Sequence, residues 1–179
     1  MEIDKLLNGR EHKGADKQLE DAKADYAMVL KKNADAEERA QEKIDAANKA
    51  RIDAQGKIEA INLAIYEASA QYEKNAEELN RIGGIDVKIR EQLTKDNEAI
   101  LAKIQNLNAQ REAAEESIVK ADRDLAQATE EKKNTELQST LNRLKAEDAI
   151  TDAHNALAEE AEKERKDKER KAAEEEQAK

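Results

Sequence analysis

Two adjacent glycines, Gly83 and Gly84, interrupt a chain of 179 residues that contains no proline. Proline breaks helix interiors because it lacks an amide donor, so its absence favours long uninterrupted helices. One glycine costs about 1 kcal/mol in a helix interior, and two neighbouring glycines double that cost. Asp86 follows them and is a residue type that caps the start of a helix. We therefore expect two long helices joined by a turn at residues 83–86.

The first helix is predicted from an apolar stripe whose spacing alternates between four and three residues. The stripe runs from residue 15 to residue 79, and two spacings of four adjoin only at Ala40–Ile44 and Tyr72–Ala76. A strict repeat of seven residues drives left-handed supercoiling, and inserted fours locally unwind it. The pattern predicts one helix over 15–82, engaged in a weakly supercoiled coiled coil. Residues 1–14 are predicted as a short helical or irregular lead-in.

A similar stripe follows the glycines and predicts a second helix over 87–158. It weakens through Thr129–Thr135 and then resumes; its members include Ile85, Ile89, Leu93, Ile100, Ile104, Leu107, Ile118, Leu125, Leu137, Leu141 and Leu144. Residues 159–179 contain charged residues, alanine and glutamine only. Opposite charges three and four residues apart support a solvated helix, so this segment is predicted as a charged single-helix extension.

The two stripes together predict an all-α fold, a long antiparallel helical hairpin. A reversal centred between the glycines sets Asn33 opposite Asn134 and Arg51 opposite Glu116. In the seam, where the stripes of the two helices pack together, each polar residue of one stripe would thus face a polar residue of the other helix. Buried polar groups require such partners. A parallel dimer would instead set Arg51 against Arg51. One long continuous helix within an oligomer is the alternative architecture.

Candidate partner contacts lie off the stripe and at the turn. Leu63 and Tyr66 lie off the stripe, where they form either a contact surface or a broadened core face. Ile82 and Val87 flank the turn and are expected at the tip of the hairpin. The partner that we expect is another protein or a second copy of the chain.

The composition argues against several kinds of ligand. The formal net charge is −10 and basic residues are interleaved with acidic ones, which disfavours nucleic-acid binding. The chain has no cysteine, so thiolate metal sites and disulfides are excluded. His12 and His154 would lie near each other in the hairpin, but we interpret them as solvated side chains rather than metal ligands. No phosphate-loop, dinucleotide or HExxH pattern occurs. We expect no cofactor, no small-molecule substrate and no enzymatic activity.

No apolar run approaches the length of a membrane span and no Sec-type signal is visible, so we expect no membrane insertion. A location in the cytoplasm or within a larger assembly fits these features. The function that we expect is that of a structural or interaction coiled coil, a rod or spacer, for example in a phage or another assembly. In architecture and composition the chain resembles the long helical hairpins of colicins. That resemblance implies the receptor-binding or spacer hairpin of a bacteriocin. An assembly scaffold or holdase is a further alternative.

Overall fold

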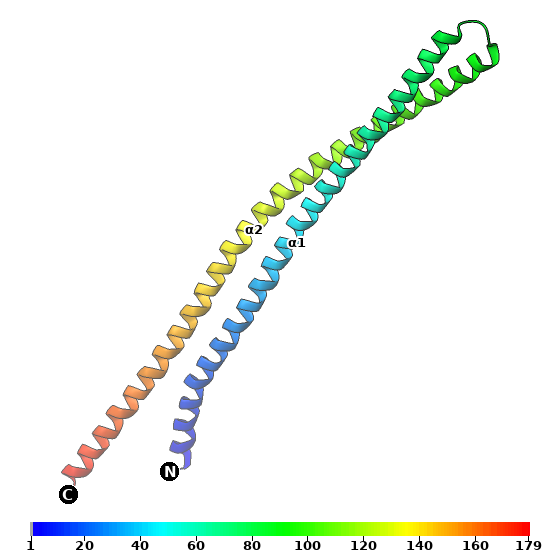
Figure 1. The fold of residues 1–179 in the computed structure, drawn as a ribbon. Coiled ribbons are helices and arrows are strands. Elements are labelled where there is room, and N and C mark those ends of the chain that lie inside the picture. The colour runs from blue at the N-terminus through cyan, green and yellow to red at the C-terminus, as the bar shows by residue number, and fades with distance from the viewer. Residues whose placement is uncertain (1) are drawn as a thin grey trace. The chain divides into compact units, whose positions relative to one another are not determined.

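The protein folds as two long helices that pack against each other in opposite directions (Figure 1). The computed structural model describes the backbone of residues 2–179 and the side chains of residues 14–179. Helix α1 spans Glu2–Ile82 and helix α2 spans Val87–Gln177. The predicted all-α antiparallel hairpin with its turn at Gly83-Gly84 is therefore confirmed. The backbone of the lead-in is helical from Glu2, and the charged extension is helical to Gln177.

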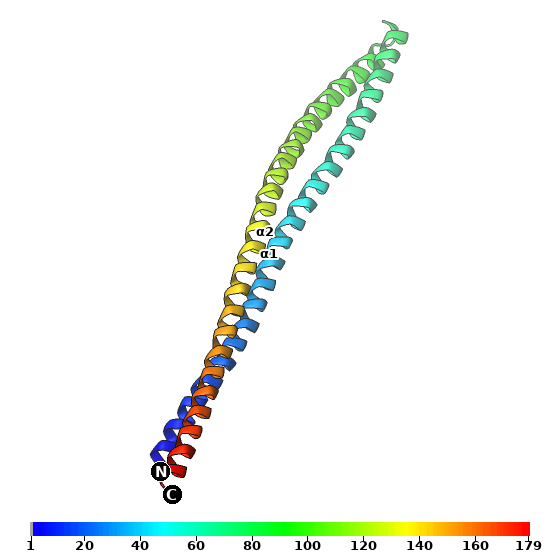
Figure 2. The same ribbon diagram turned by 90° about the vertical axis from the view of Figure 1, so that its left-hand side faces the viewer.

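The hairpin divides into two compact units, each of which contains a stretch of both helices. One unit joins the residues up to Ala40 to those from Glu131 onward, and the other comprises Gln41–Glu130. We call them the terminal unit and the turn unit. In the turn unit, α1 leads into the turn and α2 returns from it, which Figure 2 shows from a second direction.

The seam of the turn unit is built on alanines spaced seven or fourteen residues apart. The buried ones are Ala47, Ala54 and Ala68 in α1, and Ala114, Ala121 and Ala128 in α2. Half-buried isoleucines and leucines alternate with them, among them Ile58, Ile65, Ile104 and Ile118. A repeat of seven residues brings the same helix face back to the partner on every second turn. Apart from Ile85 and Ile89 next to the turn, the apolar residues of the predicted stripe in this unit thus lie on the face that packs.

Polar contacts in the turn unit correct the predicted register. The Arg51 guanidinium lies 3.2 Å from an Asp122 carboxylate oxygen, where Glu116 was expected. Asn97 donates a hydrogen bond of 3.5 Å to the backbone carbonyl of Tyr72. The helices end at residue 82 and begin again at residue 87, so the reversal is centred beyond the two glycines. The residue of α2 that faces a given residue of α1 therefore has a higher number than predicted. Contacts along the seam set how much higher that number is.

The terminal unit shows the same correction at its polar seam position. The Asn33 side-chain amide donates to the backbone carbonyl of Ser139 at 2.9 Å. Its carbonyl oxygen accepts a hydrogen bond of 3.5 Å from Asn142. Asn134, the predicted partner, is exposed instead. A polar residue in the seam of α1 thus does meet polar groups of α2, but further along the helix than predicted.

Between residues 135 and 144 the seam of the terminal unit follows small polar residues of α2 rather than its leucines, whereas Ala153 is buried and Leu157 half-buried further along. Ser139 is buried, and Thr135 and Asn142 are half-buried. Leu137, Leu141 and Leu144, predicted to continue the stripe, are exposed at 58%, 52% and 46%. Thr135, Ser139 and Asn142 continue the spacing of three and four residues that begins at Leu125 and Ala128. The three leucines could lie in the seam only if this spacing were interrupted. The prediction that these leucines lie in the seam is therefore wrong.

Two glycines of the hairpin should respond to alanine with opposite signs. Gly83 has a φ of 59°, a conformation that costs an L-residue about 1 kcal/mol, so Gly83→Ala should destabilise the fold by about that amount. Gly56 lies inside α1 with nothing within 4 Å of an added Cβ, so Gly56→Ala should stabilise by about 1 kcal/mol. The free energy of unfolding in urea measures both. Equal effects of the two substitutions would contradict the turn geometry.

The corrected register predicts which charges are coupled. A double-mutant cycle of Arg51→Ala and Asp122→Ala should give a coupling of about 0.2–1 kcal/mol, because both side chains are half-exposed. The matched cycle of Arg51→Ala with Glu116→Ala should be additive within error. Urea denaturation at low ionic strength measures both cycles. If Arg51 were coupled more strongly to Glu116 than to Asp122, the register predicted from the glycines alone would be correct.

Candidate functional site at the hairpin tip

The tip of the hairpin is a short turn whose backbone is held by hydrogen bonds. The amide of Gly83 donates to the carbonyl of Leu79 at 3.2 Å, which closes the last turn of α1. The amide of Ile85 donates to the carbonyl of Ile82 at 3.4 Å. Glycine suits this end of a helix because the residue beyond the cap adopts the left-handed conformation. The chain therefore leaves α1 in one defined direction.

Asp86 starts the second helix, as the sequence predicts. Its carboxylate accepts a hydrogen bond of 3.3 Å from the amide of Ile89, and its backbone carbonyl accepts one of 3.1 Å from the amide of Arg90. The Arg90 guanidinium reaches back to the carbonyl of Gly83 at 3.2 Å. The cap satisfies an amide that has no partner within the helix, and Arg90 ties the first turn of α2 to the end of α1.

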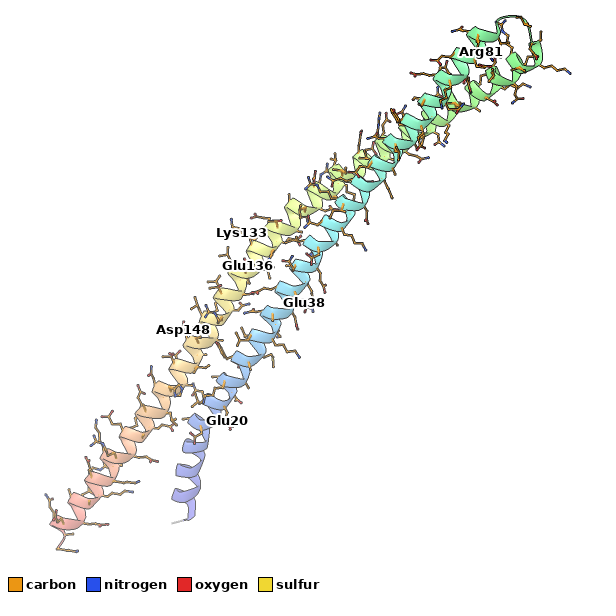
Figure 3. The ribbon with its side chains drawn as sticks, viewed as in Figure 1. Glu20, Glu38, Arg81, Lys133, Glu136 and Asp148 are labelled. Atoms are coloured by element: carbon orange, nitrogen blue, oxygen red, sulfur yellow. The ribbon has the colours of Figure 1, made fainter. Side chains whose placement is uncertain are left out.

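Arg81 lies beside the turn on α1 (Figure 3), where it forms an ion pair with Glu78. The Arg81 Nε donates to a Glu78 carboxylate oxygen at 2.9 Å, and its Nη2 contacts the other oxygen. The hydrogen bonds from Arg81 lower the pKa of Glu78 below its ordinary value, and those to Glu78 raise the pKa of Arg81. Both side chains reach solvent, so this fork orders the last turn of α1 rather than forming a buried ion pair.

Three branched apolar side chains are exposed at this tip, and we call them the tip surface: Ile85, Val87 and Ile89. Ile85 is exposed at 93%, Val87 at 63% and Ile89 at 48%. The sequence assigned Ile85 and Ile89 to the seam, which is incorrect because α2 begins only at Val87 and its first seam residue is Leu93. Of the two tip contacts predicted, Val87 is exposed and Ile82 is half-buried.

Leu63 and Tyr66, the other predicted contact, lie on the arm of α1 within the turn unit. They are exposed at 59% and 73%. They stand three residues apart, hence on neighbouring positions of one helix face. The interpretation as a broadened core face is not supported by this exposure. The contact surface stays a prediction, separate from the tip surface.

An open groove runs along the seam of the turn unit, with a volume of about 730 Å³. Alanines line much of it, including Ala54 and Ala114, together with Asp53, Lys57 and Gln110. Its depth follows from the small side chains of the seam. No histidine lines the groove, and its charged lining residues are Asp53 and Lys57 of α1.

Neither metal-binding clusters nor membrane-length apolar segments are found in the part of the chain that the structure describes. No group of three or more histidine or acidic side chains there could hold a metal ion. His12, considered with His154 as a metal pair, lies outside the described side chains. None of the described helical segments is both apolar enough and long enough to cross a bilayer.

Comparisons with known proteins identify no relative of the chain. The chain matches no protein-family model, no curated protein and no solved structure. The assignment of a function therefore depends on the geometry and chemistry of its surfaces.

The charged fork at the tip predicts a specific titration. Arg81→Ala should raise the pKa of Glu78 toward its ordinary value, because the hydrogen bonds that favour the carboxylate are lost. Since the folded pKa is lowered, the ionised carboxylate stabilises the fold above the ordinary pKa. That contribution is lost as the pH falls through the lowered value. Side-chain NMR titration of Glu78 measures the change. Arg90→Ala is the control and should leave this titration unaltered.

Proposed function

We propose that the chain is a non-enzymatic interaction protein whose helical hairpin presents an apolar tip for docking to another protein. The observation that carries the proposal is the exposure of Ile85 together with Val87 and Ile89 on a turn held by hydrogen bonds. Exposed branched side chains on a defined backbone lose little conformational freedom on binding, so a partner gains most of their burial.

The charges around the turn support a protein partner over a nucleic acid or a membrane. Glu78 is paired with Arg81, and Asp86 is engaged in capping the helix. Arg90 is directed to a backbone carbonyl. These charges are thus committed to the structure of the turn, while the apolar side chains remain available. An apolar centre within a polar rim is the arrangement that protein interfaces use.

The architecture supports a role in holding surfaces rather than in chemistry. The seam is filled mostly by alanine and branched aliphatic side chains, and the groove beside it is open. Catalysis uses oriented polar groups in a concave site from which water is excluded. The arms of the hairpin would serve as a spacer that carries the tip surface.

A photo-reactive amino acid placed at Ile85 tests the docking surface. In cells that naturally make the protein, the full chain should form one covalent adduct with a partner on irradiation. The double substitution Val87→Ser/Ile89→Ser should reduce that adduct at least about tenfold, because removal of two apolar contacts weakens a small interface by that order. The adduct is measured by immunoblotting and identified by mass spectrometry.

Ile52 provides the matched control, since it is an isoleucine exposed at 65% on the arm of α1. The same photo-reactive residue at that position should not give the adduct. Equal labelling from both positions, or an adduct that survives the double substitution, would refute docking at the tip. Circular dichroism should show the same helicity for every variant.

A further inference from the structure

The exposed leucines of α2 form a continuous stripe within the terminal unit. Leu137, Leu141 and Leu144 follow one another at spacings of four and three, and Lys133 and Asp148 continue the same line at its two ends. These spacings keep all five positions within about a quarter of the helix circumference. Figure 3 shows Lys133 and Asp148 on the side of α2 turned away from α1. We call the three leucines the leucine stripe.

This stripe contrasts with the seam of the same helix. Between residues 135 and 144 the positions that face α1 are buried Ser139 and half-buried Thr135 and Asn142, while the three leucines are exposed. Covering a leucine releases much more free energy than covering a serine, because burial scales with apolar area. A helix that places leucines outward at seam-like spacing has the pattern of a second packing face.

We propose that the leucine stripe is a self-association surface, on which a second copy of the chain packs its own leucine stripe in the opposite direction. The two-fold axis of this dimer passes between Thr140 and Leu141. It sets Leu137 of one copy level with Leu144 of the other, and each such contact occurs twice. Thr140 is suited to the axis because its hydroxyl already donates to the carbonyl of Glu136 at 3.1 Å.

Charge complementarity selects this arrangement. The same axis sets Lys133 of each copy level with Asp148 of the other, so opposite charges close both ends of the stripe. A parallel pair would set Lys133 against Lys133 and Asp148 against Asp148. An antiparallel pair shifted by three residues sets Lys133 level with Lys145, and one shifted by four the other way sets Leu137 level with Asp148. Only the proposed register joins leucine to leucine and lysine to aspartate.

The size of the surface predicts weak association. Three leucines from each copy cover much less than the interface area of stable dimers. The two terminal ion pairs are exposed and contribute orientation and register more than affinity. Dimer formation should therefore depend on protein concentration. The proposal is independent of the tip surface, which lies in the turn unit.

Sedimentation equilibrium of the full chain tests the proposal over concentrations from about 10 µM to about 1 mM, the range of weak dimers. The unaltered chain should pass from monomer to dimer in this range. Leu137→Ser/Leu144→Ser should weaken dimerisation at least about tenfold through lost apolar burial. Leu101→Ser is the matched control, since Leu101 is exposed at 45% on α2 but lies outside the stripe. It should leave dimerisation unchanged.

Charge reversal tests the register separately from the leucines. Lys133→Glu should weaken the dimer, and the double variant Lys133→Glu/Asp148→Lys should recover it because opposite charges meet again. Since the chain has no cysteine, a single Leu141→Cys should form disulfide-linked dimers at the axis on mild oxidation. Lys133→Cys alone should not, because about 22 Å of helix separates the two copies of that position.

Four outcomes would overturn the proposal. The first is an unaltered chain that stays monomeric up to about 1 mM. The second is a leucine double variant that associates as the unaltered chain does. The third is a charge-reversed pair that fails to recover dimerisation, and the fourth is Lys133→Cys crosslinking as readily as Leu141→Cys.

Discussion

The alanine seam is the contact on which the rest of the hairpin depends. Alanines spaced seven or fourteen residues apart are buried in both helices of the turn unit, and no large side chain is fully buried among the described residues. Small side chains allow the backbones of two helices to approach, but each covers little apolar area. At about 25 cal/mol per Å², an alanine contributes far less than an isoleucine. Such a seam favours packing over its whole length without strongly favouring one register.

The alignment of α2 along α1 is therefore set by the turn and by a few polar contacts. The turn defines one end through the left-handed Gly83, the cap by Asp86 and the reach of Arg90 to the Gly83 carbonyl. Away from the turn, Asn33 bonds both to the backbone and to a side chain of α2. A polar residue in an otherwise apolar seam specifies alignment at some cost in stability. Asn97 shows that cost, because its buried carbonyl oxygen has no hydrogen-bond partner.

The fold class and the turn could be predicted because their signals are local. Proline absence, stripe spacing and two adjacent glycines each act within a few residues, and the cap at Asp86 requires only its own side chain. The pairing of Arg51 and Asn33 could not be predicted in the same way. It depends on how far α2 slides along α1, and an alanine seam leaves that displacement to weak contacts. A polar seam residue does contact a polar partner, as predicted, but the partner is a different residue from the one predicted.

The prediction that the three leucines lie in the seam is wrong for a different reason. That reason concerns which face of α2 packs against α1. Hydrophobicity favoured Leu137, Leu141 and Leu144 as seam residues, but the phase set by Leu125 and Ala128 leads to Thr135 and Ser139. A coiled coil keeps its phase because a jump would rotate the packed face away from its partner. Continuity of spacing thus outweighed side-chain size. The result is a seam whose polar groups bond within the hairpin and an outer face whose apolar area remains uncovered. Alignment within the hairpin thus uses one side of α2, and the three leucines leave apolar area exposed on the other side.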